Sequence, residues 1–543
     1  MDRGASDGRE TGSVAAIDGL ARATARWHAK HAFVAAFVLV SAAKLWLAAN
    51  LSPFGDEAFY WQESRQPAWS YSDVPGLTAW LIAAGESIGG HSTLAMRSWF
   101  LVLGGAVPWM MVLFARRCFG ADAGWQAGLW TLAMPLAGTL GVLALPDVPL
   151  TFAALLALIA LERALRTQST AAWALVGLAL AMAWLAHYRA AMLLASGFVL
   201  FIASPGGRAQ WRRSGLWLAL ALSAFGLLPL VWFNLAHDWH GLGFQFVERH
   251  PWAFHADALV QPLEQALVVT PLLFIALLAA LAHAWRRRRE GLPWDLLAWI
   301  AGSSLMAWFL LGLFADAERF RVHWPLQAWL PLLAAVPVML RVWRPGLRRA
   351  FAIAGGGLGV LGGMMVMAWL AAATLPASTP PAWSDPFPRH FVGWNEAGAA
   401  ARRLLAADRD GNILLVADNF MLAAELDFAF DGTRPVFALD SPLNAKHGRA
   451  AQLALWDRDE AALHRHAGRR VLLAVDETAL RERDRAAWLD ALCRRVAVLE
   501  PVERLDLFDG RKRIAFLTGV VPAAGEAAGC AYPSRAGSFP WAL

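Results

Sequence analysis

Long apolar runs, separated by short polar segments, dominate the first 374 residues of the chain. A run of roughly 17 to 25 apolar residues is needed to cross the hydrocarbon core of a bilayer. The pattern therefore predicts a polytopic α-helical membrane protein with about eleven transmembrane helices. The predicted spans are 32–51, 94–115, 124–144, 147–165, 170–187, 189–204, 214–235, 264–285, 294–314, 325–342 and 350–374.

The pattern changes after residue 374. A Pro-rich segment is followed by short β-like runs at 412–417, 434–439 and 471–475, which alternate with amphipathic segments. This alternation predicts a small soluble α/β domain. We therefore divide the chain into an N-terminal cytoplasmic tail (1–31), a membrane domain (32–374) with a first outer loop at 52–93, a Pro-rich linker (375–390) and a C-terminal α/β domain (391–543).

Arginine placement predicts the orientation, because cytoplasmic loops carry an excess of Lys and Arg. With the N-terminus inside, most arginines of the membrane domain fall in cytoplasmic connections. The stretch Leu77 to Gly89 is apolar but short and contains Glu86, so we expect it to lie along the outer surface. If it crossed the membrane, every later loop would change sides. The first loop and the C-terminal domain are thus predicted to be periplasmic. The predicted cytoplasmic arginines are Arg116, Arg117, Arg163, Arg166, Arg208, Arg212, Arg213, Arg286 to Arg289, Arg341, Arg344, Arg348 and Arg349.

Composition supports a membrane protein and excludes one partner class. Hydrophobic residues make up 58% of the 543 residues and charged residues 17%, which is too apolar for a soluble protein of this size. The net charge of +6 comes from short arginine clusters between apolar runs, not from one basic face. We therefore expect membrane lipids as partners and no nucleic acid.

The first outer loop holds the first candidate chemistry. It contains Asp56, Glu57 and Tyr60 in the stretch GDEAFYW, followed by Tyr71 and Asp73. A solvated acidic loop is the ordinary interpretation of such residues. Here, however, the aromatic residues would hold the loop at the membrane interface, so its acids cannot all point into bulk water.

A lone acid and three basic segments lie on the same predicted face. Asp147 stands in the stretch LPDVPL between two spans, where a buried carboxylate needs a partner. Basic residues at helix ends often reach only to lipid headgroups. Arginine on this face would also suit a lipid phosphate, which it can bind with two parallel hydrogen bonds. The basic candidates are Arg189, Arg249, Arg321 and His323.

Five segments in order resemble a known family. The segments are DEAFYW, YSDVPGLTAWLI, IGGHSTLAMRSW, LPDVPL and VHWPLQAWLPLL. They resemble the bacterial membrane glycosyltransferases related to aminoarabinose transferase and protein O-mannosyltransferase, within the glycosyltransferase-C superfamily. The resemblance covers about residues 30 to 350. It implies the fold of that superfamily, a polyprenyl-phosphate sugar as donor, an active site between the outer loops and the membrane, and inversion at the anomeric carbon.

The resemblance also implies roles for individual residues. Asp56 would act as general base on the acceptor hydroxyl, and we group Glu57, as its positioning neighbour, and Asp73 with it as candidate catalytic residues. The candidate acceptor or sugar pocket contains Asp147, Tyr60 and Tyr71. The candidate donor phosphate site contains Arg189, Arg249, Arg321 and His323.

Two departures from the family pattern limit this transfer of roles. Many relatives carry DHPP where this chain has Asp73-Val74-Pro75-Gly76, so a histidine is missing and a loop-bound metal is disfavoured. We assign no metal ligand, although a divalent metal stays possible. Relatives often carry Lys-Tyr where this chain has His187-Tyr188-Arg189, which leaves open which residue holds the phosphate.

The expected function is inverting transfer of a sugar from a polyprenyl-phosphate donor to a lipid, glycan or protein acceptor. The expected place is the periplasmic face of the bacterial inner membrane. A transporter or lipid flippase is the alternative, but it predicts charged residues near mid-membrane. Apart from Lys44, Glu162 and Arg163 near span ends, the spans lack them. A non-enzymatic assembly subunit would leave the grouped acids unexplained.

Overall fold

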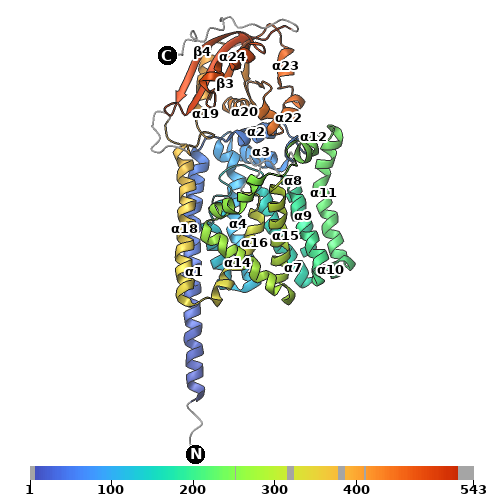
Figure 1. The fold of residues 1–543 in the computed structure, drawn as a ribbon, viewed down its shortest axis with the longest axis vertical. Helices are drawn as coiled ribbons and strands as arrows, with labels where there is room; N and C mark the ends of the chain where they lie inside the picture. The colour runs from blue at the N-terminus through green and yellow to red at the C-terminus, as the bar shows by residue number, and fades with distance from the viewer. Residues whose placement is uncertain (1–6, 251, 315–322, 377–385, 409–410, 524–543) are drawn as a thin grey trace, which may run out of the picture.

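The structure is a computed structural model that describes residues 7–250, 252–314, 323–376, 386–408 and 411–523. A bundle of helices is capped at one end by a domain of mixed helices and strands (Figure 1). The helices of the bundle and its connections are α1 (Asp7–Asn50), α2 (Gly55–Arg65), α3 (Leu77–Gly89), α4 (Thr93–Phe119), α5 (Ala121–Ala133), α6 (Pro135–Gly138), α7 (Asp147–Thr167), α8 (Thr170–Ala186), α9 (Ala190–Ala203), α10 (Pro205–Arg208), η1 (Ala209–Arg212), α11 (Ser214–Ala236), α12 (His240–Gly243), η2 (Phe244–Glu248), η3 (Ala256–Val260), α13 (Gln261–Val268), α14 (Pro271–Arg287), η4 (Arg288–Glu290), α15 (Trp294–Gly312), α16 (Leu326–Leu333), α17 (Val336–Met339), η5 (Leu340–Val342) and α18 (Pro345–Ala372).

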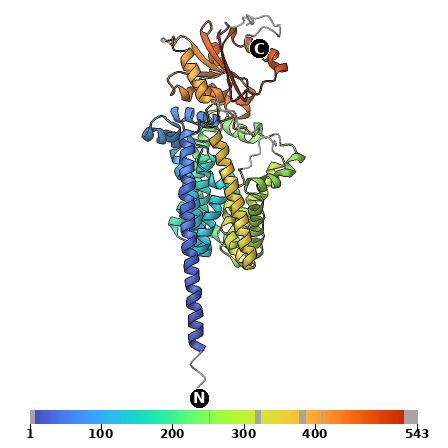
Figure 2. The same cartoon turned by 90° about the vertical axis from the view of Figure 1, so that its left-hand side faces the viewer.

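The helices account for a multi-pass membrane protein. Six helices of the described chain are long and apolar enough to cross a membrane, and eight spans result if each of two bent pairs counts as one. One bent pair combines 190–203 with 205–212 at 96°, and the other combines 256–268 with 271–290 at 107°. The predicted count of eleven spans is therefore not confirmed. The long helices α1 and α18 run the length of the bundle up to the capping domain (Figures 1 and 2).

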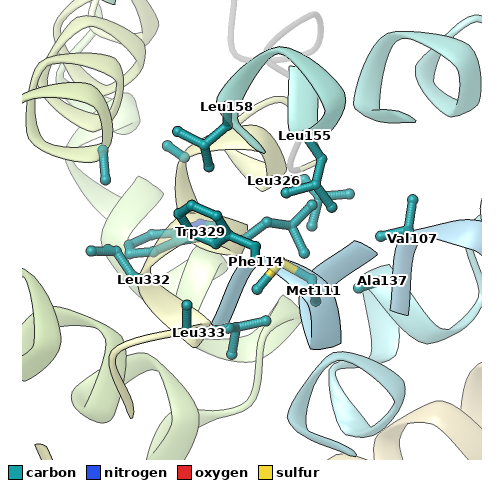
Figure 3. Packing of buried hydrophobic residues seen from close by; sticks show 14 of the residues in the cluster. Val107, Met111, Phe114, Ala137, Leu155, Leu158, Leu326, Trp329, Leu332 and Leu333 are labelled. Atoms are coloured by element: carbon teal, nitrogen blue, oxygen red, sulfur yellow. The ribbon is translucent and has the colours of Figure 1, made fainter. Parts of the chain in front are cut away.

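Close packing holds the bundle together. In a bilayer the lipid is as apolar as the side chains, so helices associate through van der Waals fit and small residues at their interfaces. At the centre, Trp329 and Phe114 are fully buried beside Met111 (Figure 3). Between α8 and α11, a Cβ on Gly177 would lie 2.6 Å from the Ala219 carbonyl oxygen, and one on Gly226 would lie 2.3 Å from that of Ala181. These helices can approach so closely only because glycine has no side chain.

The first loop forms two helices across the end of the bundle. α3 covers Leu77–Gly89, so the predicted surface helix is confirmed as a helix, and it is not among the candidate spans. Its only acid, Glu86, accepts a hydrogen bond from Trp61 Nε1 at 2.8 Å and lies 2.9 Å from His91 Nδ1. α2 lies between the bundle and the capping domain (Figure 1), and nine of its eleven residues are buried.

The capping domain, which we call the C-terminal α/β domain, is built on a five-stranded mixed sheet with the order β2-β1-β3-β5-β4. β1 is parallel to β2 and β3, whereas β5 is antiparallel to β3 and β4. Its elements are α19 (Trp394–Leu404), β1 (Leu414–Ala417), α20 (Phe420–Ala429), β2 (Val436–Ala438), α21 (Pro442–Lys446), α22 (Ala450–Leu455), α23 (Glu460–His464), β3 (Arg470–Asp476), η6 (Glu482–Asp484), α24 (Arg485–Cys493), β4 (Ala497–Leu507) and β5 (Lys512–Val520).

The C-terminal α/β domain shares its core with α2. Ala58 and Phe59 of α2 are fully buried in the same apolar cluster as Phe420 and Phe516 of the domain. Burial of a Phe side chain is worth roughly 1.5–3 kcal/mol outside the lipid phase. The two parts of the molecule are therefore packed together through apolar contacts, and α2 belongs to both.

Candidate active site

A cavity of about 430 Å³ lies where the C-terminal α/β domain meets the end of the bundle. Its walls come from α2, the loop before α3, the start of α7, the turn between α8 and α9, η2, residues 323–324 and the turn between α21 and α22. The cavity thus gathers seven of the ten candidate residues predicted from the sequence: Asp56, Tyr60, Asp73, Asp147, Arg189, Arg249 and His323.

The acidic wall of the cavity is organised around one arginine. Asp56 stands in the first turn of α2, where the helix dipole favours an acid. Arg449 Nη2 lies 3.4 Å from Asp56 Oδ1, and Arg449 Nη1 lies 2.6 Å from Asp73 Oδ2. Asp56 keeps 21% of its side chain exposed, whereas Asp73 and Arg449 are buried. Asp56 is therefore the carboxylate of this wall that an incoming molecule can reach.

A further acid, Glu63, lies behind this wall. It is fully buried, and its Oε1 is 3.5 Å from Arg449 Nη1. Burial, together with the nearby charge of Asp73, raises the pKa of Glu63 well above its usual value. Burial also raises the pKa of Asp73, although the Arg449 guanidinium acts in the opposite direction. The surroundings of Glu63 therefore favour its protonated form.

A second group of lining residues, which we call the basic wall, is built around Arg189 and Arg249. Asp147, at the first turn of α7, accepts a hydrogen bond from Arg189 Nη2 at 2.6 Å and lies 3.2 Å from His323 Nε2. Arg189 Nε and Nη1 are buried and have no hydrogen-bond partner among the described residues. A guanidinium that is held on one edge keeps its other donors for an anionic ligand.

An aromatic ring supports both arginines of this wall. The guanidinium carbons of Arg189 and Arg249 each lie 5.4 Å from the centre of the Trp324 ring. Arg249 Nη1 also donates to Gln245 Oε1 at 3.1 Å, and Gln245 Nε2 donates to the Asp73 carbonyl oxygen at 2.7 Å. These contacts fix the two cations relative to the acidic wall.

His187 also faces the cavity, in the turn between α8 and α9. Burial, assisted by the charge of Arg189, lowers the pKa of His187 well below its usual value. Its Nδ1 accepts a hydrogen bond from the Arg189 backbone N–H at 3.0 Å. The imidazole is therefore neutral, and it orients the turn that carries Arg189.

Glu57 does not line the cavity, and its grouping with the catalytic residues is corrected. Both of its carboxylate oxygens bind Arg97, at 2.8 and 2.7 Å, and neither side chain is exposed. Glu57 also accepts hydrogen bonds from the backbone N–H groups of Ala144 and Phe54. Both carboxylate oxygens are thus hydrogen-bonded to α4, to the segment before Asp147 and to the start of α2. The function of Glu57 is therefore to position these elements.

The two pocket tyrosines differ. Tyr60 lines the cavity, and Arg449 Cζ lies 4.7 Å from the centre of its ring. Tyr71 does not line it: its hydroxyl donates to the Glu63 carbonyl oxygen at 2.7 Å and accepts from the Ala68 N–H at 3.1 Å. Tyr71 therefore holds the loop before α3, and its assignment to the pocket is wrong. Arg321 lies outside the described residues.

Sequence reasoning missed the basic residues that the C-terminal α/β domain contributes. Lys446, His447 and Arg449 all line the cavity, and His447 Nδ1 lies 3.6 Å from Asp56 Oδ1. Their dense spacing in the stretch KHGR was a signal of local charge. Nothing in the sequence related that stretch to an acid almost 400 residues earlier.

Among the described residues, no group of three or more His, Cys, Asp or Glu side chains is arranged to hold a metal ion. In the acidic wall, Arg449 occupies the position between Asp56 and Asp73.

Comparisons with known proteins show which proteins the chain is similar to. Residues 73–233 match the family model described as dolichyl-phosphate-mannose-protein mannosyltransferase. The lipid A galacturonosyltransferase RgtD of Rhizobium johnstonii is 25% identical over 403 residues, which cover 71% of this chain and 79% of that protein.

Solved structures share the fold. The crystal structure of ArnT from Cupriavidus metallidurans in the apo state superposes with a TM-score of 0.61 at 16% identity, covering 90% of this chain and 98% of that one. The same protein bound to undecaprenyl phosphate gives a TM-score of 0.60 at 16% identity, with 89% and 97% covered.

The chain thus has the fold of ArnT. Its similarity to a mannosyltransferase family model and to a lipid A galacturonosyltransferase agrees with the resemblance that the ordered sequence segments carry.

Proposed function

We propose that the protein transfers a sugar from a polyprenyl-phosphate donor to the hydroxyl group of an acceptor lipid, glycan or protein, with inversion, at the periplasmic face of the bacterial inner membrane. The observation that carries the proposal is the cavity itself. Its lining combines an accessible carboxylate, Asp56, with two guanidinium groups that lie over the Trp324 ring.

The basic wall suits the phosphate of the donor. Arg189 and Arg249 supply charge-assisted hydrogen-bond donors, and His323 lies beside them. As the bond between the anomeric carbon and the phosphate oxygen breaks, the electron pair leaves with the phosphate, whose growing negative charge these groups stabilise. A phosphate leaving group is far less basic than an alkoxide, so it needs no proton from the enzyme.

The acidic wall suits the acceptor. Asp56 would take the proton of the acceptor hydroxyl while the acceptor oxygen forms its bond to the anomeric carbon. Attack from the side opposite the phosphate inverts the configuration at that carbon. The acidic and basic groups line the same cavity, and this in-line geometry requires that they act on opposite sides of the anomeric carbon.

An apolar space next to the basic wall suits the lipid part of the donor. A second cavity, of about 140 Å³, shares Arg189, Arg249 and Trp324 with the first. Met192, Trp308 and Leu311 line its other side. An isoprenoid chain attached to a phosphate on the arginines would find apolar surface directly beyond them.

The relatives suggest which substrates to test first. The curated relative is named for transfer of galacturonic acid to lipid A, and the related crystal structure contains undecaprenyl phosphate. We therefore propose undecaprenyl-phosphate-linked galacturonic acid with lipid A as the first donor and acceptor pair.

The reaction is tested with purified protein and this pair. The proposal predicts one sugar transferred for each undecaprenyl phosphate released, with inverted configuration at the anomeric carbon by NMR spectroscopy. Release of sugar without transfer, or retention of configuration, would contradict it.

The periplasmic orientation has its own test. Protease added to intact spheroplasts should digest the C-terminal α/β domain, because the proposal places it outside. Protection in spheroplasts, with digestion after lysis, would show that the topology is inverted.

A further inference from the structure

Arg449 of the C-terminal α/β domain is buried in the wall of the cavity, although every acid it contacts belongs to the first loop. Only 2% of its side chain is exposed. Its guanidinium lies 2.6 Å from Asp73, 3.4 Å from Asp56 and 3.5 Å from Glu63. One cation of the C-terminal α/β domain is therefore shared by three carboxyl groups, and all three belong to the first loop of the membrane domain.

Aromatic rings fix the guanidinium in place. Its central carbon lies 4.2 Å from the centre of the Phe59 ring and 4.7 Å from that of Tyr60. A cation above such rings is attracted by their negative faces, and the attraction is larger when water is excluded. Arg449 is thus held by α2 as well as by its ion pairs.

The turn that carries Arg449 is fitted to the first loop by backbone contacts. Ser72 Oγ donates to the Gly448 carbonyl oxygen at 2.7 Å, and the Ser72 N–H donates to Gln452 Oε1 at 2.9 Å. Gly448 has φ +74°, and a Cβ there would lie 2.7 Å from the Phe244 ring. These contacts place Arg449 beside Asp73 only when the C-terminal α/β domain is seated on the bundle.

Three carboxyl groups in a small buried volume repel one another when ionised. A guanidinium between them offsets this repulsion and allows the exposed member, Asp56, to carry its charge. We propose that Arg449 is a positioning residue for sugar transfer, which keeps Asp56 ionised and directed into the cavity. The C-terminal α/β domain is then a part of the active site that the membrane domain cannot replace. This inference rests on the proposed function.

Two measurements on Arg449→Gln test the inference. The first is labelling of Asp56 and Asp73 by a hydrophobic carbodiimide, which reacts with protonated carboxyl groups, followed by mass spectrometry across pH. Removal of the guanidinium raises the pKa of Asp73 further, because burial then acts without its main opposing charge. We expect labelling of both residues to extend upward by about one pH unit or more, which corresponds to a tenfold change in ionisation.

The second measurement is turnover of the undecaprenyl-phosphate donor. We expect kcat to fall about 100-fold, in the range that a general base contributes, with an acid limb displaced to higher pH. KM for the donor should change little, because the ion pairs of Arg449 are with acids of the first loop and not with the Asp147 pair that holds Arg189. Arg449→Lys keeps the positive charge but lacks the planar guanidinium that contacts several carboxyl groups at once. Its labelling profile and its kcat should therefore lie between those of Arg449→Gln and wild type.

Arg465→Gln is the matched control. Arg465 belongs to the same domain and pairs with Asp457, but 62% of its side chain is exposed. The control should behave as wild type in both measurements. The inference is overturned if folded Arg449→Gln labels and turns over like wild type, or if the control shifts equally. If Arg449→Gln does not fold, the labelling of Arg449→Lys decides: an unchanged profile overturns the inference.

The labelling does not depend on the identity of the substrates, so the two proposals fail separately. If wild-type protein shows no transfer while Arg449→Gln still shifts the labelling, the proposed function fails and the electrostatic coupling stands. If Asp56→Asn abolishes transfer while Arg449→Gln has no effect on either measurement, the inference fails and the proposed function stands.

Discussion

Two arginine–carboxylate pairs near the same end of the bundle differ in how many of their polar atoms have hydrogen-bond partners. Glu57 and Arg97 are fully buried, and both oxygens of Glu57 accept hydrogen bonds from Arg97 and from backbone N–H groups. Arg97 Nη1 donates hydrogen bonds to the carbonyl oxygens of Ala48 and Leu51 at the end of α1. Asp147 and Arg189 form an equally short pair, but two donors of Arg189 have no partner among the described residues.

The difference separates a structural pair from a binding pair. A pair whose donors and acceptors all have hydrogen-bond partners fixes helices and cannot bind a ligand. A pair that keeps N–H donors without partners beside a cavity can still bind an anion. The adjacent residues Asp56 and Glu57 show the same contrast, because one faces the cavity and the other is enclosed.

The largest effect that tests this contrast is on stability. Glu57→Gln leaves the Arg97 charge buried without its partner, and breaking a buried pair in this way costs about 3–5 kcal/mol. We expect a large fall in the thermal unfolding temperature in detergent and poor accumulation of folded protein. An unfolding temperature equal to that of wild type would show that the pair is not structural.

The open pair should instead affect binding. Arg189→Gln removes the donors that face the cavity, and we expect undecaprenyl phosphate to bind about 10- to 100-fold more weakly, with a smaller change in stability. Binding is measured by titration of purified protein. Arg166→Gln, at a partly exposed arginine that pairs with Glu162, is the control and should bind as wild type. Equal binding by Arg189→Gln would remove the arginine from the phosphate site.

A smaller effect is expected at the ring beneath the two cations. Trp324→Leu keeps an apolar side chain but removes the face on which Arg189 and Arg249 rest. A cation–π contact contributes about 0.5–2 kcal/mol, so binding of undecaprenyl phosphate should weaken about threefold to tenfold. Trp285→Leu removes a ring that stacks on Arg288 and should leave binding unchanged. The ring has no role in the site if both variants bind alike.

The smallest effect on turnover is expected at Glu63. Burial raises its pKa well above 4.5, so the protonated form resembles glutamine and Glu63→Gln should retain turnover within about threefold at neutral pH. As pH rises above the unfolded pKa, the unfolded chain loses this proton before the native protein does, so the stability of wild type falls. Glu63→Gln removes that fall, and its stability relative to wild type should increase as the pH rises above about 5. A loss of stability like that of Glu57→Gln would contradict the protonated state.

Much of the framework could be predicted because local patterns determine it. The helix at Leu77–Gly89 has the predicted bounds, and β1, β2 and β3 overlap the three predicted runs. The count of eleven spans is not confirmed, and some of the predicted apolar runs bend. The run at 189–204, for example, continues after a 96° bend into a second helical segment. Hydropathy records how apolar a segment is, but not whether its helix stays straight.

The site was predictable only as far as the motifs extend. The segments that resemble the family contain Asp56, Asp73, Asp147 and His323, which all reach the cavity. The same motif could not separate Asp56 from Glu57, because the partner that encloses Glu57 is Arg97 on another helix. Arg449 contacts Asp56 across 393 positions of the chain, and such a pairing exists only after the C-terminal α/β domain has docked.

We propose that Asp56 performs the proton transfer in a polyprenyl-phosphate-dependent sugar transfer. This role is tested by kcat of Asp56→Asn, measured with the undecaprenyl-phosphate donor on protein whose unfolding temperature is determined in parallel. The account predicts a fall of about 1,000-fold or more, with the unfolding temperature little changed, because Arg449 keeps Asp73 as a partner. Transfer at a rate near that of wild type would contradict it.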